Sequence, residues 1–488
     1  MTRVTSLHSE ADRPQPGRHV PPAGGVPNTT SLKRVAAASS IGTTIEYYDF
    51  FIYGTAAALV FPTVFFPNSD PAVGTIASFA TFAVAFFARP VGSILFGHFG
   101  DSIGRKRTLV WTLLIMGIAT VGIGFMPGYE TGVFGFFDGG IGIWAPILLV
   151  LMRFFQGFAV GGEWAGATLL TAEYAPPGQR GRMAMFPQLG PAFAFFLASG
   201  TFLLASVTVG ATSEAFLNYG WRIPFIASSV LIAVGFWIRL SVEETPVFTE
   251  RKAAMDLEAK SSVESRKLPF MEVIKVQWRE ILIAAGASTT LFSLFYIGTA
   301  FLTSYGTGTL AMSRTTILAM GMGSAVVFGI ATAVSATLSD KIGRKTIIRA
   351  VMIVSVPWAL VLFPLLDTGS PWAFFIATTV TLSLYGASNG PTGALLPEMF
   401  RARFRYTGAG LSYNLAGILG GAIAPLVAAQ IVADNDSIWV GVMLAVLALL
   451  SVGCSILIKE TKGKNMDDDE VASAAPAAAP STPVVRQN

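Results

Sequence analysis

The sequence predicts an all-α membrane protein in which twelve transmembrane helices form two pseudo-symmetric six-helix bundles. Three observations predict this class. The 488 residues are 52% hydrophobic and 13% charged, with a mean hydropathy of +0.60, and a soluble domain carries about twice that share of charge. Twelve apolar runs are each long enough to cross a bilayer. A charged motif recurs about half a chain later, which is typical of duplicated bundles in secondary transporters.

The expected elements follow in order along the chain. Residues 1–30 are expected to form a disordered tail, 31–241 the first bundle, 242–279 a charged cytoplasmic linker, 280–459 the second bundle, and 460–488 a second disordered tail. The first six spans are expected at 33–61, 72–97, 108–127, 144–172, 183–209 and 221–241. The other six are expected at 280–306, 314–338, 346–366, 371–399, 407–433 and 436–458.

The basic residues predict the orientation. Lys and Arg gather in both tails and in every second loop, as at 105–107, 251–279 and 401–405, while the loops between them hold few. Arg222 and Arg314 are exceptions, and both lie at helix starts. Because basic loops tend to stay on the cytoplasmic side, twelve spans with both termini in the cytoplasm satisfy this pattern.

The recurring motif reads Asp-Ser-Ile-Gly-Arg-Lys at 101–106 and Asp-Lys-Ile-Gly-Arg-Lys at 340–345. Each copy lies between two apolar runs. In the first copy, Gly97 and Gly104 allow a close helix contact and a tight turn. The repeat therefore marks the same loop in both bundles.

We interpret this loop as a conformational latch. Asp101 is placed to meet the N-terminus of the helix expected near Thr407, whose dipole attracts an anion. Arg105 is placed to pair with Glu173 at the inner end of the fourth span. Such contacts would hold the bundles together on the inner side in one state and release them in the other. The alternative is that Arg and Lys here only enforce the topology.

The second copy predicts a second latch. Its residues are Asp340, Gly343 and Arg344, with Glu398 in the place of Glu173. Ala336 stands where the first copy has a glycine. The motif therefore favours the first copy over the second as a latch.

Away from the ends of the expected spans, the first bundle contains five charged residues and the second bundle contains none. A charge inside the bilayer costs several kcal/mol unless it is paired or hydrated. Counting residues from the inner ends of the spans places three of them about 15–18 Å deep, close to the middle of a ~30 Å core. We therefore expect a functional site among Glu46, Asp49, Arg89, Arg153 and Glu163.

The spacing of these residues indicates their roles. Glu46 and Asp49 are three positions apart and share one face of the first span. Two carboxylates this close in a low dielectric do not both ionise readily, so one is expected to carry a transported proton. Arg153 and Glu163 complete the proton-coupling group, and the alternative for all four residues is a fixed structural network. Arg89 is expected to grip a substrate carboxylate, or else to neutralise Glu46 or Glu163.

Polar groups in the other spans are candidates for the rest of the substrate site. Helix-weakening sequences at Pro187-Gln188 and Asn389-Gly390-Pro391 can expose backbone groups to a cavity. The expected substrate-binding residues are Arg89, Gln188, Tyr296, Tyr385, Asn389 and Asn414.

Several stretches resemble the major facilitator superfamily, and in particular its metabolite:proton symporter branch, which includes α-ketoglutarate, shikimate, citrate and proline/betaine permeases. They are the 101–106 motif with its leading glycine, Ile45–Gly54, Ala88-Arg89-Pro90, Arg153–Glu163, Trp221–Phe225, Glu243–Phe248 and Pro397-Glu398. The resemblance implies the major facilitator fold and a place in the cytoplasmic membrane of a bacterium. It also implies that Asp49, in its Tyr-Asp context, is the proton site and pairs with Arg153.

The function expected from these features is proton-coupled uptake of a small organic acid, such as a dicarboxylate or an aromatic or alicyclic carboxylate. Uptake of a zwitterion of the proline or betaine type, and a proton-independent facilitator, are the alternatives. No phosphate-binding loop of the Gly-x4-Gly-Lys type occurs, and three histidines offer no metal cluster, so neither a pump nor an enzyme is expected. The expected partners are the solute and the bilayer, with no metal, no nucleic acid, no cofactor other than the proton, and a monomeric chain.

Overall fold

The structure is a computed structural model that describes residues 29–103, 105–134, 139–161, 163–173, 175–176, 178–210, 213–241, 269–401 and 404–463. Its elements are helices. The first half contains α1 (Thr29–Leu59), α2 (Phe61–Phe65), α3 (Pro71–Ile103), α4 (Arg105–Gly124), α5 (Trp144–Val160), α6 (Glu163–Glu173), α7 (Arg180–Val209), α8 (Glu214–Asn218), the short 3-10 helix η1 (Gly220–Arg222) and α9 (Ile223–Ser241). The stretch between α4 and α5, expected as a loop, is not helical where it is described.

The second half repeats this pattern of long helices. It contains α11 (Pro269–Tyr296), the π-helix η2 (Ile297–Phe301), α12 (Leu302–Gly308), α13 (Arg314–Ile342), α14 (Arg344–Leu366), α15 (Pro371–Met399), α16 (Arg405–Ala416), the π-helix η4 (Gly417–Ile423), α17 (Ala424–Asp434) and α18 (Ile438–Leu457).

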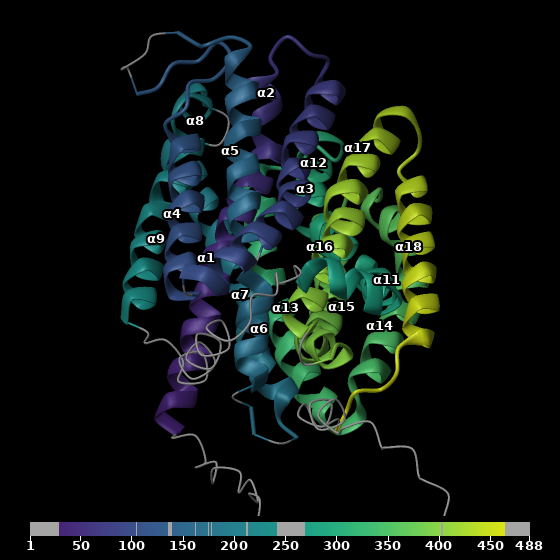
Figure 1. Cartoon of the computed structure of the whole chain (residues 1–488). Coiled ribbons are helices and arrows are strands. Elements are labelled where there is room, and N and C mark those ends of the chain that lie inside the picture. Colours follow the sequence, from purple (N-terminus) through teal and green to yellow (C-terminus); the bar gives the residue numbers. More distant parts are fainter. Residues whose placement is uncertain are drawn as a thin grey trace, which may run out of the picture.

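The long helices run up and down side by side, with the first half on one side and the second half on the other (Figure 1). We call the end at which α1 begins and α18 ends the lower end, and the opposite end the upper end. Within the first half, α1 packs on α7, α3 on α5 and α4 on α9. Within the second half, α13 packs on α15 and α14 on α18. The two halves meet where α7 packs on α13 and α3 on α17.

Ten helical segments of the described chain are long and apolar enough to cross a membrane. They cover ten of the twelve expected spans. The remaining two stretches, 33–61 and 371–399, form the long helices α1 and α15. Both are less apolar than the other ten, since α1 carries Glu46 and Asp49 and α15 carries several Thr, Ser and Asn residues.

Three expected spans are interrupted helices. The span at 144–172 breaks at Gly161 into α5 and α6, and the spans at 280–306 and 407–433 contain the π-helices η2 and η4. A π-helix inserts an extra residue into a turn and often lies at a functional site. All three interruptions lie midway along the bundle, where the two halves face each other.

Helix α11 begins earlier than the sequence indicates. It starts at Pro269, inside the stretch expected to be a linker, and bends at Gln277, whose backbone angles are not helical. Val273 is fully buried and Gln277 nearly so, and the Gln277 side-chain oxygen accepts a hydrogen bond from the Arg401 backbone N–H at 3.4 Å. The apolar face of this segment packs on the lower end of the second half, which explains why it is helical.

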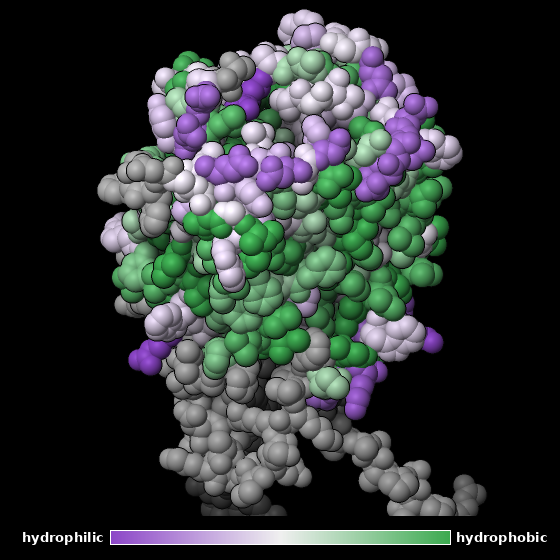
Figure 2. All heavy atoms as spheres, turned by 90° about the horizontal axis from the view of Figure 1, so that it is seen from above, coloured by the Kyte–Doolittle hydropathy of each residue, from purple (hydrophilic) through white to green (hydrophobic). Residues whose placement is uncertain are grey.

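The surface of the molecule is strongly apolar. Hydrophobic side chains cover a broad continuous part of it, with hydrophilic ones gathered apart from them (Figure 2). Ile118, Trp237 and Trp372 are each at least 70% exposed. A soluble protein rarely exposes so large an apolar surface, so this band is the surface that faces lipid.

Candidate substrate and proton site

Asp49 is the centre of a buried hydrogen-bond network in the first half. Its Oδ1 accepts hydrogen bonds from the Gln156 side-chain amide at 2.7 Å and from the Thr120 hydroxyl. The Gln156 amide also donates to the Thr120 hydroxyl at 3.0 Å, and its oxygen accepts from Arg153 Nη1 at 3.2 Å. Arg153 Nη1 lies 4.0 Å from Asp49 Oδ2. The network joins α1, α4 and α5 and balances one buried carboxylate with one buried guanidinium.

Aromatic rings enclose the Arg153 guanidinium. Its central carbon lies 4.1 Å from the ring centre of Tyr53, 4.3 Å from that of Phe50 and 4.9 Å from that of Phe82. These cation–π contacts stabilise a charge that is fully buried. They also keep the guanidinium beside Asp49.

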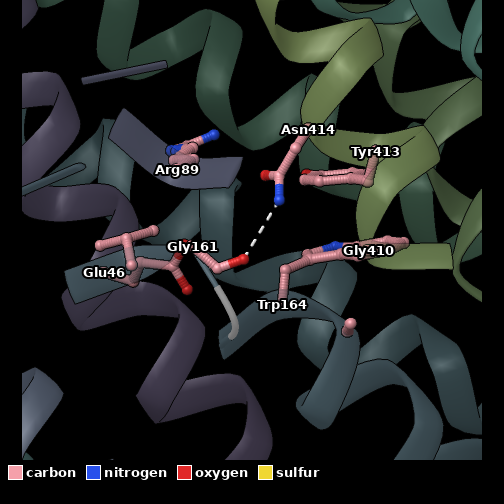
Figure 3. A pocket seen from close by; sticks show the side chains of 9 residues that line it. Glu46, Arg89, Gly161, Trp164, Gly410, Tyr413 and Asn414 are labelled. Atoms are coloured by element: carbon pink, nitrogen blue, oxygen red, sulfur yellow. Dashed lines mark hydrogen bonds between the residues drawn. The ribbon is translucent and has the colours of Figure 1, made fainter. Parts of the chain in front are cut away.

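A second pair of charges lines a small cavity at the junction of the two halves. Glu46 of α1 and Arg89 of α3 lie on one side of it, and Tyr413 and Asn414 of α16 lie on the other (Figure 3). The break between α5 and α6 adds the Gly161 carbonyl, which accepts a hydrogen bond from the Asn414 amide at 3.2 Å. Both halves of the molecule therefore contribute to one polar cavity.

Arg89 presents its edge to this region. The central carbon of its guanidinium lies 4.1 Å from the ring centre of Phe50 and 4.8 Å from that of Phe86. Its Nε and Nη2 are buried, and within the described part of the chain neither makes a hydrogen bond. The Tyr296 hydroxyl and Glu46 are close enough to interact with this cation electrostatically. A buried donor without an acceptor is costly, so this edge is suited to a bound anion.

An aromatic pair lies at the side of the cavity. The rings of Trp164 on α6 and Tyr413 on α16 stack with their centres 3.6 Å apart and their planes 7° apart. The Tyr413 hydroxyl is hydrogen-bonded to that of Tyr47. The Trp164 indole N–H donates to Gln188 Oε1 at 3.1 Å. The ring stack and the Tyr47–Tyr413 hydrogen bond join the two halves at the cavity, while the bond to Gln188 fixes Trp164 within the first half.

Gln188 and Asn389 bind each other across the junction. The Gln188 amide donates to the backbone and side-chain oxygens of Asn389, each at 2.8 Å, and the Asn389 amide donates to the Gln188 carbonyl at 3.1 Å. Both are expected substrate ligands, but here they are not part of the cavity lining. Pro191 has no N–H to offer the Pro187 carbonyl, which accepts from Thr43 at 2.9 Å instead. The weakened helix positions thus serve contacts between helices.

The cavity has a volume of about 10 Å³, which is close to the least that holds one water molecule. Contacts also join the halves above it, where Arg314 at the start of α13 donates to the Leu59 carbonyl at 3.3 Å and covers the Phe216 ring at 4.3 Å. In this conformation the halves touch both above and below the cavity. A solute can therefore enter only when the halves move apart.

The other expected site residues lie nearby in different roles. Tyr296 packs among Phe82, Phe86 and Phe295, and Tyr385 stacks on Phe295 with ring centres 4.1 Å apart. Glu163 begins α6 and is buried, but it does not line the cavity. Of the ten residues expected to couple protons or bind substrate, Glu46, Arg89 and Asn414 line the cavity, while Asp49 and Arg153 form the adjoining network.

Sequence reasoning missed three residues with a clear place in the site. Thr120 and Trp164 are single residues in apolar runs, and such residues are more often simple packing. Tyr47 adjoins Glu46, whose charge inside an apolar run is the stronger sequence signal. Two of them could have been identified from their neighbours in the sequence, because Trp164 follows Glu163 at the helix break and Tyr47 follows Glu46 in the first span.

At the lower end, the second copy of the repeated motif joins the two halves. Asp340 accepts hydrogen bonds from the backbone N–H groups of Gly181 and Arg182, both at 2.9 Å. These belong to the first turn of α7, where backbone donors have no partner within the helix and the dipole favours an anion. Arg180 of the same turn pairs with Glu398 on α15 at 3.8 Å.

Arg344 ties these groups together. It lies 2.9 Å from Asp340 and 3.3 Å from Glu398. The segment after α18 joins the same cluster, because Glu460 accepts from the Arg344 and Lys345 backbone N–H groups at 3.0 and 3.2 Å. Thus residues expected to begin a disordered tail are bound to the lower end of the second half.

The alanine at position 336 does not prevent close contact between the helices at the second copy. Close contact here depends on the opposite helix, since a Cβ added to Gly181 would lie only 2.5 Å from the Ala336 carbonyl oxygen. A glycine at 336 is therefore not needed. Gly343 adopts φ +102° and ends α13, as a tight turn requires.

The first copy cannot be compared in the same way. The backbone of Gly97, Asp101, Arg105 and Glu173 lies in helices, but their side-chain surroundings, and Gly104 entirely, fall outside the described residues. Their roles stay predictions. Among the described residues, no group of three or more His, Cys, Asp and Glu side chains is placed to hold a metal ion.

An all-helical apolar molecule with a buried, charged site between two halves belongs to the class of membrane transporters. The family model described as "Sugar (and other) transporter" matches residues 35–471. The chain belongs to this family, within the major facilitator superfamily, and is a multi-pass membrane protein and not an enzyme.

Relatives cover nearly the whole chain. The inner membrane metabolite transport protein YhjE of Escherichia coli K12 is 44% identical over 441 residues, covering 89% of this chain and 96% of that protein. The shikimate transporter of the same strain is 34% identical, with 90% and 98% covered. Its proline/betaine transporter is 31% identical, with 89% and 84% covered.

Solved structures share the fold. A crystal structure of a D-xylose-proton symporter superimposes with a TM-score of 0.69 at 17% identity and covers 89% of this chain and 99% of that one. A partially occluded inward-open structure of the xylose transporter XylE of E. coli gives a TM-score of 0.65 at 18% identity. The chain therefore has the major facilitator fold and takes a small molecule as its substrate.

Proposed function

We propose that this protein is a secondary active transporter that takes up a small organic acid together with protons across the cytoplasmic membrane of a bacterium. Twelve spans, counting α1 and α15, form two bundles that expose the cavity to each side in turn, with both termini in the cytoplasm. The observation that carries the proposal is the pair of buried carboxylates on α1. Glu46 lines the cavity between the halves together with Arg89, and Asp49 lies 4.0 Å from Arg153 in the adjoining network.

Asp49 is the proton site in this proposal. Its Oδ1 already accepts two hydrogen bonds, whereas its Oδ2 makes none within the described chain and faces Arg153 at 4.0 Å. A proton on Oδ2 therefore disturbs no existing hydrogen bond. Protonation leaves Arg153 without a counter-charge, and the rings around that guanidinium limit the cost.

Arg89 binds the substrate carboxylate. Its Nε and Nη2 make no hydrogen bond within the described chain, and two parallel N–H donors match a carboxylate. Glu46 lines the same cavity. It competes with an anionic substrate for Arg89 unless it is protonated, which couples anion binding to a proton.

The test is uptake into proteoliposomes under an imposed pH gradient, after competition among succinate, benzoate, shikimate, proline and glycine betaine has identified a substrate. If one proton is transported with each solute molecule, a pH difference of one unit can raise the internal solute concentration about tenfold above the external one. Asp49→Asn should abolish accumulation but keep counterflow, in which labelled solute exchanges for unlabelled. Asp367→Asn is the matched control, because that carboxylate also accepts two side-chain hydrogen bonds, from the hydroxyls of Tyr305 and Ser437, but lies at the upper end.

Undiminished accumulation by Asp49→Asn would reject Asp49 as the proton site. Uptake by the unmodified protein that a protonophore leaves unchanged would instead favour a facilitator.

One observation favours a zwitterionic substrate as a second candidate. The cavity holds both a carboxylate and a guanidinium, which would match the two charges of proline or betaine. Inhibition by glycine betaine and proline, with no effect of succinate, benzoate or shikimate, would favour this function over organic acid uptake.

A further inference from the structure

We propose that Trp164 determines substrate specificity by providing a flat surface for a planar, ring-bearing carboxylate, whose ring enters between Trp164 and Tyr413 while its carboxylate binds Arg89. This inference rests on the proposed function and specifies its substrate class. Trp164, Tyr413 and Arg89 line the same cavity and approach it from α6, α16 and α3 (Figure 3).

The aromatic pair is placed to open when the halves move. Trp164 belongs to the first half and Tyr413 to the second, so separation of the halves separates the two rings. The nearly parallel stack, with ring centres 3.6 Å apart, is not the arrangement that two electron-rich rings prefer, which is offset or edge-to-face. Separation therefore costs little ring–ring attraction, although it also breaks the Tyr47–Tyr413 and Asn414–Gly161 hydrogen bonds. The π-helix η4 begins shortly after Tyr413 and gives that side a segment that can adjust.

Trp164 keeps its orientation when the second half, and Tyr413 with it, moves away. Its indole N–H donates to Gln188 Oε1 within the same half, and its side chain is 4% exposed. A ring whose plane is already fixed loses little entropy when it binds a ligand. The exposed face of Trp164 then replaces the lost Tyr413 contact with the ring of the substrate.

The geometry favours a flat ring over a quaternary ammonium group. The two rings touch in this structure, and when the halves separate their parallel faces can admit one flat ring between them. An aromatic cage for a cation instead surrounds it with rings at angles. Arg89, with two buried N–H groups that make no hydrogen bond within the described chain, lies on the same cavity and requires acceptor oxygens. Both features are met by a carboxylate attached to a planar ring.

The test compares benzoate with cyclohexanecarboxylate, which have the same charge and similar size but differ in planarity. Binding to the purified full-length protein in lipid nanodiscs is measured by titration calorimetry. We expect benzoate to bind about three- to tenfold more tightly, which is the range of one aromatic contact. Trp164→Leu should remove this difference. Trp358→Leu should keep it, because the Trp358 indole N–H also donates to a side-chain oxygen, Thr381 Oγ1 at 3.0 Å, but lies away from the cavity.

Equal binding of the two acids, absence of benzoate binding, or a benzoate preference that survives in Trp164→Leu would overturn the inference. So would glycine betaine binding that depends on Trp164 while benzoate does not bind. If Trp164→Leu does not fold, Tyr413→Leu removes the opposite face and must also reduce the preference. Succinate binding that requires Arg89 would leave the proposed function standing even when the ring preference is absent.

Discussion

Phe50 shows how single residues set the properties of the site. Its ring lies 4.1 Å from the Arg89 guanidinium and 4.3 Å from that of Arg153, so one apolar side chain stabilises two buried cations and keeps them apart. Glu46 precedes it by one turn on α1 and Asp49 is its neighbour. Helices α1, α3 and α5 thereby hold two carboxylates and two guanidinium groups around the Phe50 ring.

The charged residues around the cavity and Asn414 were predictable from the sequence, whereas Thr120 was not. A charge in an apolar run is costly enough that its presence alone indicates function, which identified Glu46, Asp49, Arg89 and Arg153. A lone Thr120 in an apolar helix has no such cost. Its role depends on which way α4 faces, which only the packed structure defines.

Replacing Arg89 tests its role in binding. Arg89→Lys keeps the charge but loses the planar fork and the faces that pack on Phe50 and Phe86. We expect the KM for the transported acid to rise about tenfold, as for loss of a charge-assisted hydrogen bond. Arg349→Lys is the matched control, because Arg349 donates to the Ser455 carbonyl at 3.2 Å away from the cavity. The KM is measured from initial uptake rates at a series of solute concentrations. An unchanged KM would exclude Arg89 as a ligand.

At the scale of helices, small residues bring α3 and α5 together. A Cβ added to Gly157 would lie 2.2 Å from the Ala85 carbonyl oxygen, and one added to Gly161 would lie 2.0 Å from that of Arg89. This close approach brings α3, which carries Arg89, against α5, which carries Arg153. Gly157 on α5 and Gly161 just after its end are four residues apart, the spacing at which small residues permit close packing of membrane helices.

The positions of the helices were predictable from hydropathy, but their interruptions were not. The break at Gly161 and the π-helices η2 and η4 depend on contacts between distant helices, such as Asn414 with the Gly161 carbonyl. Likewise the pairing of Gln188 with Asn389 joins residues far apart in the chain. The periodic pattern of apolar residues indicates only which residues share a face of one helix, and it does not indicate contacts between distant helices.

Gly157→Val should separate α3 from α5. Its side chain would meet backbone rather than a flexible side chain, so we expect a loss of about 1–3 kcal/mol in stability and a lower melting temperature. Gly453→Val is the control, because nothing lies within 4 Å of a Cβ added at Gly453. Thermal unfolding of the purified proteins, followed by fluorescence, measures the difference. Equal melting temperatures would contradict this account of the helix contact.

At the scale of the whole molecule, the repeated motif predicted where the two halves are held together. The sequence favoured the first copy because of its glycine, yet the second copy supplies the contacts that the structure describes, from Asp340 to the start of α7 and from Glu398 to Arg180. Sequence could not predict this, because the small residue that matters, Gly181, lies in the opposite half.

Asp340→Asn should weaken this contact and favour the state in which the lower ends separate. The charge at the α7 N-terminus and the ion pair with Arg344 are lost together, and we expect the separated population to increase about fivefold or more. Spin labels at Gln179 and Thr346, with Cys454 replaced by Ser, measure the distance. Asp436→Asn is the control, because Asp436 is exposed between α17 and α18. An unchanged distance distribution would show that Asp340 is no latch.

The central claim is that the acids of α1 link solute movement to protons. In the most direct measurement, the transported acid is added at high concentration outside proteoliposomes, and the internal pH is followed with a trapped dye. The unmodified protein should move protons with the solute, and Glu46→Gln/Asp49→Asn should move none while still exchanging solute. Solute-driven proton entry that persists in the double variant would contradict the account.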